Sequence, residues 1–244
     1  MMETKIDKYD GKAVDWTPPL PVLPRPICGI LGDQEAPAEL KGPLILFSSG
    51  LDSTYLVYEA LKTSNVHLLY VIGNLRNTKV KEELEAREKI KQHFEENPHS
   101  QYRIVSDTIL RFEVGDAELM LNGVRLTQPA TWMYPSLYFY KSGMHTSVQI
   151  AYVKDDIIIP HLNDLQVAWD SLTKVVKTAQ IPLEFPHKDV DKNDSYKALP
   201  DPLKDLIWVC DDPWVDGNRN TIECKRCGPC IRRVAYLNNY KESQ

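Results

Sequence analysis

The stretch FSSGLDST, from Phe47 to Thr54, joins an apolar run to a helix-like run. Residues 43–47, PLILF, are typical of a buried strand, and residues 55–62, YLVYEALK, are typical of a helix. Small residues at such a junction allow a sharp turn that exposes successive backbone N–H groups. Together with the N-terminus of the helix, these groups predict a nest for anionic oxygen atoms.

Runs typical of strands and of helices alternate along the rest of the chain. The expected strands cover residues 44–48, 66–73, 102–107 and 155–160. The expected helices cover residues 52–62, 78–97, 136–152 and 164–179. The assignment of residues 155–160, DDIIIP, depends on three consecutive isoleucines, which suit a central strand buried on both faces. This alternation predicts an α/β fold with a parallel sheet and right-handed crossovers.

Composition excludes some classes of protein. The chain has 244 residues, 43% of them hydrophobic, and a formal net charge of −5, so its overall charge does not favour nucleic-acid binding. No apolar run approaches the roughly 20 residues that span a bilayer. The first residues are polar and lack the apolar core of a signal peptide. We therefore expect a cytoplasmic protein that does not bind membranes and does not use nucleic acid as a direct substrate.

The chain divides into three regions by composition. Residues 1–42 form a proline-rich extension that contains WTPPLPVLPRP, which favours an extended arm over a helix. This arm is either a disordered leader or a segment that packs on the core or on a neighbouring subunit. Residues 43–208 carry the α/β pattern. Residues 209–244 contain four of the five cysteines.

These four cysteines are Cys210, Cys224, Cys227 and Cys230. Their two-residue spacers let successive thiolates surround one ion, and four sulfur ligands suit zinc. A closed four-thiolate site has no position for water, so its role would be structural. Disulfides or an iron–sulfur cluster are the alternatives. The basic residues beside the cysteines could also indicate a nucleic-acid knuckle, but the patch is small and the chain is acidic.

The residues of the first loop suggest its chemistry. Ser48, Ser49 and Ser53 add hydroxyl donors to the nest, and Asp52 would bind Mg²⁺ or cap the helix. The loop lacks the spacing of a Walker P-loop and the G-x-G-x-x-G of a dinucleotide site. The alternative is an ordinary serine-rich turn with Asp52 near the helix cap.

Two motifs carry a resemblance to a known family. SSGLDS, residues 48–53, resembles the S-G-G-x-D-S loop of the N-type ATP pyrophosphatases (PP-loop enzymes), with Ser49 in place of the first glycine. CKRCGPCIRR, residues 224–233, is similar to the closing motif of the 7-cyano-7-deazaguanine (preQ0) synthases within that superfamily. VIGNLRNTKVKEELEAREKI (71–90) and DDIIIPHLND (155–164) look like two further segments of these synthases. The resemblance covers residues 43–236.

The resemblance implies a Rossmann-like adenine nucleotide alpha hydrolase fold and a ligase that cleaves ATP between its α and β phosphates. The carboxylate of 7-carboxy-7-deazaguanine is adenylated, ammonia gives an amide, and a second activation dehydrates the amide to the nitrile of queuosine biosynthesis. The implied cofactors are ATP, Mg²⁺ and Zn²⁺. The family is often dimeric, which implies a homodimer.

Site residues follow from the resemblance by position. Pyrophosphate and Mg²⁺ would be held by Ser48, Ser49, Gly50, Leu51, Asp52 and Ser53, of which Ser48, Asp52 and Ser53 form the catalytic set. Arg76 matches an arginine after the second strand, where it faces the phosphates or is a solvated surface charge. The four cysteines would hold zinc.

The substrate-binding segments of the family match less well. Its Val-Pro-Gly-Arg-Asn loop is replaced by TWMYPSLY (131–138), which supplies Trp132, and its Tyr-Pro-Asp-Cys segment is closest to Trp169-Asp170-Ser171. Trp169 would stack on the base or pack in the core, and Asp170 would accept hydrogen bonds from the N–H and amino groups of the base. Lys188 matches a family lysine that would neutralise a carboxylate or phosphate, unless it is solvated.

Three functions therefore stay open. The first is a preQ0 synthase-type ligase, including a diverged form in phage DNA modification or anti-phage defence that activates a deazapurine for another acceptor. The second is a tRNA-directed thiolation or amidation enzyme; the absence of cysteine between Cys28 and Cys210 argues against thiolation. The third is a nucleotide-binding zinc module without turnover.

Overall fold

The apolar residues before the serine-rich loop form β1 (Gly42–Leu46), the central strand of a five-stranded sheet in the computed structural model. The structure describes residues 36–72, 77–111, 128–141, 143–175, 180–216 and 220–242. The strand order is β3-β2-β1-β4-β5, and every pairing is parallel. The other strands are β2 (Val66–Ile72), β3 (Ile104–Arg111), β4 (His145–Gln149) and β5 (Leu183–Glu184). The predicted α/β fold with a parallel sheet is confirmed.

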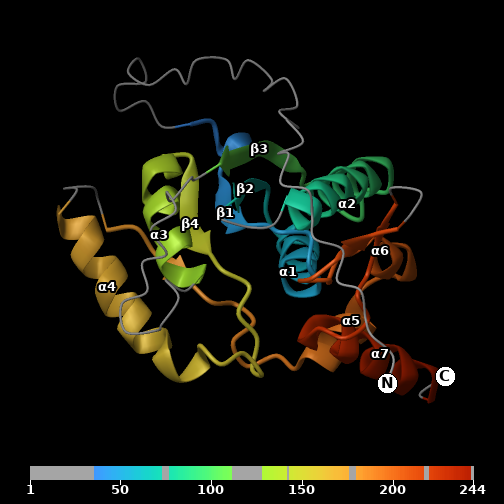
Figure 1. The fold of residues 1–244 in the computed structure, drawn as a ribbon. Helices are drawn as coiled ribbons and strands as arrows, with labels where there is room; N and C mark the ends of the chain where they lie inside the picture. Colours follow the sequence, from blue (N-terminus) through green and yellow to red (C-terminus); the bar gives the residue numbers. More distant parts are fainter. Residues whose placement is uncertain are drawn as a thin grey trace, which may run out of the picture. The chain divides into compact units, whose positions relative to one another are not determined.

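Helices cover both faces of this sheet (Figure 1). One face packs against α3 (Gln128–Phe139) and α4 (Leu162–Val175). The other packs against α1 (Leu51–Ala60), α2 (Asn77–Glu96), α5 (Lys192–Ala198) and α6 (Asp201–Leu206). The remaining elements are η1 (Ala38–Leu40), η2 (Ile159–His161), the hairpin of β6 (Trp214–Val215) and β7 (Thr221–Ile222), and α7 (Gly228–Glu242).

The core forms two layers because side chains alternate along β1. Leu44 and Leu46 join the cluster under α3 and α4, whereas Ile45 and Phe47 join the cluster under α1 and α2. All four side chains are buried, and each contributes roughly 1.5–3 kcal/mol relative to an exposed position. β1 is therefore buried on both faces, as its continuous apolar run predicts.

Two assignments made from sequence are wrong. Residues 155–160 form turns and the start of η2 rather than a strand, and Ile157 is 95% exposed. The Asp156 side chain accepts the N–H of Val153 at 3.0 Å, and its own N–H donates to the Val153 carbonyl at 2.9 Å, which closes a tight turn. The fourth strand is instead β4, inside the predicted helix 136–152; only the end of α3, up to Phe139, is helical there.

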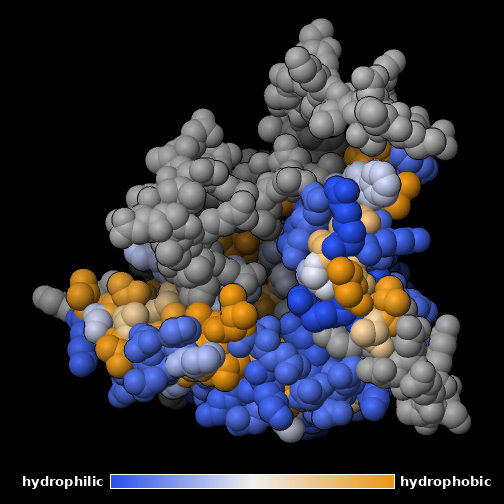
Figure 2. All heavy atoms as spheres, turned by 60° about the horizontal axis from the view of Figure 1, so that its bottom comes forward, coloured by the Kyte–Doolittle hydropathy of each residue, from blue (hydrophilic) through white to orange (hydrophobic). Residues whose placement is uncertain are grey.

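The described part of α4 carries exposed apolar side chains. Val167 is 58% exposed and Val175 is 77% exposed, while Trp169 on the same helix is fully buried. In Figure 2, hydrophobic side chains gather on the left, which is the side of α4 in Figure 1. α4 therefore carries apolar side chains on its exposed side as well as on the side that packs against the sheet.

The chain separates into two compact units, Met1–Gln34 and Glu35–Gln244. The first unit, with most of the proline-rich extension, lies outside the described residues. In the second unit, no described helix combines the length and the apolar character needed to cross a membrane.

Candidate active site

The serine-rich loop lies where the strand order of the sheet changes direction. β1 pairs with β2 on one side and with β4 on the other, so the crossover connections diverge from it. The loops that leave the carboxyl ends of β1 and β4 are therefore neighbours. In open parallel sheets this switch point is the usual place for a ligand.

Hydrogen bonds among small residues hold the loop after β1. The backbone N–H of Ser48 donates to Ser53 Oγ at 3.2 Å, and the two hydroxyl oxygens of these residues are 3.3 Å apart. Ser53 Oγ also donates to the Gly50 carbonyl at 3.2 Å. Gly50 is the N-cap of α1, so no side chain caps its first turn. The N–H groups of that turn are directed toward the position that an anion would occupy.

Ser49 adopts the left-handed backbone conformation that favours glycine. Its φ is 64°, and its side chain is fully buried. Its hydroxyl donates to the carbonyls of Ser48 and Glu83, the latter at 3.1 Å, and its own carbonyl accepts the N–H of Trp208 at 3.1 Å. Ser49, which stands in place of the first glycine of the S-G-G-x-D-S loop, thus adopts a backbone conformation typical of glycine, at a cost of about 1–2 kcal/mol.

A lysine joins two carboxylates beside this loop. Lys192 Nζ lies 3.1 Å from Asp52 Oδ2, in the first turn of α1, and 3.0 Å from Asp156 Oδ1, in the loop after β4. Asp52 Oδ1 is buried and, among the described residues, has no hydrogen-bond partner. A buried carboxylate oxygen without a partner fits a metal ligand better than a helix cap.

Burial controls the charge of these groups. It raises the pKa of Asp52 to about 6, although Lys192 opposes the shift and Asp156 adds to it. Burial alone would lower the pKa of Lys192, but the two aspartates raise it above its ordinary value. At neutral pH, Lys192 is therefore cationic and most Asp52 carboxyls are ionised, with a pKa only slightly below neutrality.

The sequence did not predict Lys192 or Asp156 as site residues. Asp156 fell in the incorrectly predicted strand, and Lys192 was not distinguished from other lysines. One signal was present: Asp191 is the N-cap of α5, and its Oδ1 accepts the N–H of Asn193 at 2.8 Å. An aspartate cap predicts a helix start, which would have placed Lys192 at its first position.

A buried arginine anchors the end of β1 from below the loop. Arg87, on α2, donates through Nη1 to the Phe47 carbonyl and through Nη2 to Asp107. Its guanidinium lies 4.6 Å from the centroid of the Phe47 ring and 4.8 Å from that of Tyr70. Lys91 Nζ reaches Asp107 at 2.6 Å. This network fixes α2, β1 and β3 to one another directly under the nest.

The four C-terminal cysteines converge as the spacing predicts. Their sulfur atoms all lie within 4.8 Å of one another, and none forms a disulfide. A tetrahedral zinc–thiolate site needs sulfur separations of about 3.8 Å, so a small contraction suffices. The N–H of Cys224 donates to Cys210 Sγ, and that of Cys227 donates to Cys224 Sγ, each at 3.2 Å. The cluster could hold a metal ion such as zinc.

The cysteine cluster is linked to the serine-rich loop through Trp208. Its backbone N–H donates to the Ser49 carbonyl, and its indole Nε1 donates to the Cys210 carbonyl at 3.1 Å. Lys79, on α2, pairs with Asp211 beside Cys210. The segment that carries the cysteines therefore supports the wall of the nest.

The other residues proposed from sequence occupy varied environments. Arg76 lies outside the described residues. Trp132 is half-buried and stacks on Tyr152 with ring centroids 6.3 Å apart. Lys188 is exposed in the turn after β5. Asp170, on α4, accepts from Gln166 at 3.0 Å.

Trp169 has the environment of a core residue. It is fully buried under the sheet, and its indole N–H donates to the Ile181 carbonyl at 2.7 Å. Trp132, Trp169 and Asp170 lie on α3 and α4, which cover the face of the sheet opposite to α1. The structure thus groups the loop residues with Lys192 and does not group them with these three.

Comparison with known proteins gives little further guidance. No model of a known protein family matches the chain, and no curated protein matches it. A solved structure, the U34-tRNA thiolase NcsA from Methanococcus maripaludis with its [4Fe-4S] cluster, is similar with a TM-score of 0.39 and 13% identity. The match covers 86% of this chain and 70% of that chain. A similarity this weak carries no argument about function.

Proposed function

We propose that this chain is an ATP-dependent carbon–nitrogen ligase of the preQ0 synthase type. The observation that carries the proposal is the set of groups at the switch point of the sheet. An uncapped helix N-terminus, a serine held in the left-handed conformation, and a lysine between two aspartates converge there. Such a set suits a polyphosphate and its metal ion.

In this proposal the pyrophosphate part of ATP binds the N–H groups at the start of α1. The hydroxyls of Ser48 and Ser53 donate to its oxygen atoms. Lys192 stabilises the negative charge that develops as pyrophosphate leaves. Asp52 and Asp156 would hold Mg²⁺, which screens the phosphate charge when bound.

The reaction proceeds in two activations. A carboxylate oxygen of 7-carboxy-7-deazaguanine bonds to the α-phosphorus of ATP as the bond to pyrophosphate breaks. Ammonia then bonds to the acyl carbon, loses a proton, and displaces AMP to give an amide. A second ATP adenylates the amide oxygen. AMP leaves with that oxygen, and loss of the two nitrogen protons gives the nitrile.

The cysteine cluster has a structural part in this proposal. Four thiolates would close the coordination of zinc and leave no position for substrate. The bound metal would hold the segment whose Trp208 N–H supports the Ser49 carbonyl. The same proposal includes a homodimer in the cytoplasm. Light scattering of the purified protein checks the dimer.

Product analysis tests the activity. Zinc-loaded protein is incubated with ATP, Mg²⁺, ammonium and 7-carboxy-7-deazaguanine, and the products are resolved by mass spectrometry. We expect AMP, pyrophosphate and the nitrile, all lost with Asp52→Ala. An amide without nitrile would mean that only the first activation occurs. ATP binding without AMP would contradict the ligase and favour a nucleotide-binding module. AMP only with another acid would favour a diverged acceptor.

A further inference from the structure

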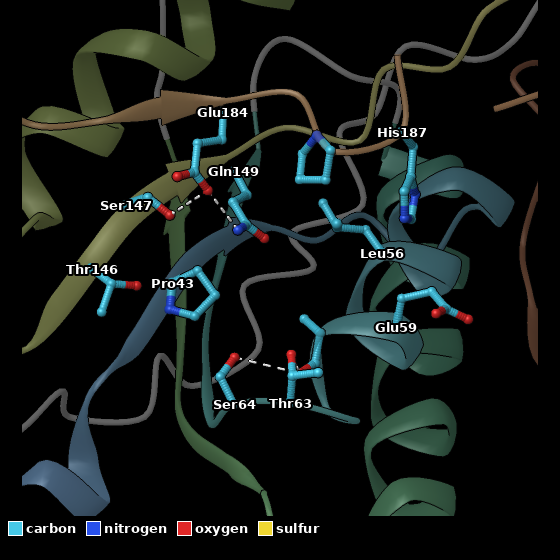
Figure 3. Close-up of a pocket in the computed structure, with 12 residues that line it drawn as sticks. Pro43, Leu56, Glu59, Thr63, Ser64, Thr146, Ser147, Gln149, Glu184 and His187 are labelled. Atoms are coloured by element: carbon cyan, nitrogen blue, oxygen red, sulfur yellow. Dashed lines mark hydrogen bonds between the residues drawn. The ribbon is translucent and has the colours of Figure 1, made fainter. Parts of the chain in front are cut away.

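A second pocket lies on the sheet beside α1, away from the serine-rich loop. Its volume is about 330 Å³, which is at the lower end for small-molecule sites. One wall is formed by the exposed face of β4 and β5, and the other by α1 and the residues that follow β5 (Figure 3). Glu59, in the wall from α1, is seven residues beyond Asp52, or about 10 Å along the helix axis.

The sheet wall presents a carboxylate and an amide oxygen. Ser147 Oγ donates to Glu184 Oε2 at 2.9 Å, and Gln149 Nε2 donates to the same oxygen at 2.8 Å. These bonds fix the orientation of the Gln149 amide, so its Oε1 is the atom left over. That oxygen is buried and, within the described part of the chain, has no partner.

The opposite wall presents a histidine ring and a second carboxylate. His187 is 7% exposed, and its ring lies 4.6 Å from that of Tyr55. Its Nδ1 is buried without a partner among the described residues. Burial lowers the pKa of His187, with Glu59 opposing the shift, so the ring is neutral at pH 7 and can accept one hydrogen bond. Glu59 adds a carboxylate, whose Oε1 pairs with the half-exposed Lys62 at 2.6 Å.

We propose that this pocket binds a small organic cation that carries a primary amine or guanidinium group. Two carboxylates line it, and no lysine or arginine is among its described lining residues. Gln149 Oε1 requires a donor that the described residues do not supply, and His187 Nδ1 requires one in the tautomer that carries its proton on Nε2. A donor-rich cation satisfies both of these atoms and the two carboxylates together, whereas an anion leaves Gln149 Oε1 without a donor.

A metal ion does not fit the same atoms. Among the described residues, the one group of three or more His, Cys, Asp or Glu ligand atoms that converge closely enough for one ion is that of the four cysteines, which do not line this pocket. In Figure 3, Glu184 lies on the sheet wall, while Glu59 and His187 lie across the pocket. A molecule with donors at both ends spans these walls, and 1,4-diaminobutane is the simplest probe of that kind.

Calorimetric titration with 1,4-diaminobutane tests the proposal, with 1,4-butanediol as an uncharged probe of the same length. We expect saturable binding of the diamine, none of the diol, and a change in the ¹⁵N shift of the His187 ring. Glu184→Gln should weaken binding at least about tenfold. Glu95→Gln, which removes the same charge from an exposed site on α2, should leave the affinity within about twofold.

No saturable binding by the wild-type protein, or equal losses in the two variants, would overturn the proposal. Thermal melting of each variant shows whether it is folded, and Gln149→Leu replaces Glu184→Gln if the latter unfolds. Asp52→Ala should bind the diamine with unchanged affinity, because the pocket does not depend on the proposed ligase. An inactive ligase with intact diamine binding would therefore refute only the proposed function.

Discussion

Ser49 shows how one residue can meet the geometry of glycine by other means. Its left-handed backbone costs about 1–2 kcal/mol, and its buried hydroxyl donates to the Ser48 and Glu83 carbonyls. Such a bond contributes about 1 kcal/mol, which offsets most of the strain. The serine is thus compatible with the turn that an anion nest needs.

Substitutions of Ser49 separate the cost of the backbone strain from the contribution of the hydrogen bonds. Ser49→Ala keeps the strain and loses the hydrogen bonds, so we expect a loss of about 1 kcal/mol in the free energy of unfolding. Ser49→Gly also loses them but relieves the strain, so it should be at least as stable as the alanine variant despite its greater unfolded entropy. Urea unfolding of both variants shows which of the two is the more stable. A glycine variant clearly less stable than the alanine variant would refute the account.

Asp52 is expected to reduce stability while it serves binding. Its pKa of about 6 in the folded state exceeds its ordinary value, so the folded protein binds more protons between pH 4 and pH 6. Stability is lost as the pH rises through that window. Asp52→Asn should therefore raise the free energy of unfolding by about 1–3 kcal/mol at pH 7 and have little effect below pH 4.

The control for this prediction is Asp189→Asn, at an exposed position after β5. It should change the stability by less than about 0.5 kcal/mol at either pH. An Asp52→Asn variant that is less stable than the wild type at pH 7 would show that burial of the ionised Asp52 carboxylate does not destabilise the folded protein.

Local rules made the loop residues candidates for the site but did not indicate the lysine beside them. Ser48, Gly50 and Asp52 were identified because a strand, small residues and a helix start follow one another in the sequence. Lys192 and Asp156 meet Asp52 only through the packing of α5 and the loop after β4. No local pattern encodes that contact.

At the scale of elements, Arg87 links α2 to the sheet through polar contacts. It is fully buried and pairs with Asp107, which also contacts Lys91. Arg87→Met would leave Asp107 with one partner and remove the donor to Phe47, so we expect a loss of about 3 kcal/mol in the free energy of unfolding. Arg103→Met, at an exposed site before β3, is the control.

Adding Asp107→Asn to Arg87→Met completes a double-mutant cycle. We expect a coupling of at least about 1 kcal/mol between the two residues. Additive losses would show that the pairing of Arg87 with Asp107 does not stabilise the protein.

The amino ends of β2 and β4 carry a buried histidine pair that predicts acid sensitivity. The rings of His67 and His145 lie 4.5 Å apart. Burial, with His67 and Lys141 adding to it, lowers the pKa of His145 to about 3. Below pH 6.5, His145 binds a proton in the unfolded chain but stays neutral in the folded protein. The free energy of unfolding therefore falls by up to about 1.4 kcal/mol for each unit that the pH decreases.

His145→Asn should flatten the decline of stability between pH 6.5 and pH 5 in urea unfolding. His161→Asn, at a position 64% exposed on η2, should leave the slope unchanged. Equal slopes for the wild type and the His145 variant would exclude this histidine as the cause.

Elements were predictable where their own apolar pattern decided their burial, and the prediction failed where tertiary packing or a local turn decided the structure. β1, β2, α1 and α2 follow their patterns closely. β4 has the sequence HTSVQ, whose burial comes from its position between β1 and β5 rather than from its composition. Residues 155–160 have strand composition, but the Asp156 turn and Pro160 prevent pairing.

At the scale of the whole molecule, the cysteine cluster should control the order of the nest. We expect one bound zinc per chain, lost in Cys227→Ser and retained in Cys28→Ser. Because the Trp208 N–H donates to the Ser49 carbonyl, chelation should increase hydrogen exchange of the Trp208 amide. The amide of Leu69, in the central sheet, should stay protected. Unchanged exchange at Trp208 after zinc removal would show that the cluster and the loop are independent.

Adenylation of a carboxylate at the switch point is the central claim, and oxygen transfer tests it most directly. The protein is incubated with ATP, Mg²⁺, ammonium and 7-carboxy-7-deazaguanine labelled with ¹⁸O in its carboxylate. The account predicts AMP that carries one ¹⁸O atom, because the carboxylate oxygen bonds to the α-phosphorus, and no such AMP from Lys192→Ala or Asp52→Ala. Unlabelled AMP, or ADP as the nucleotide product, would contradict it.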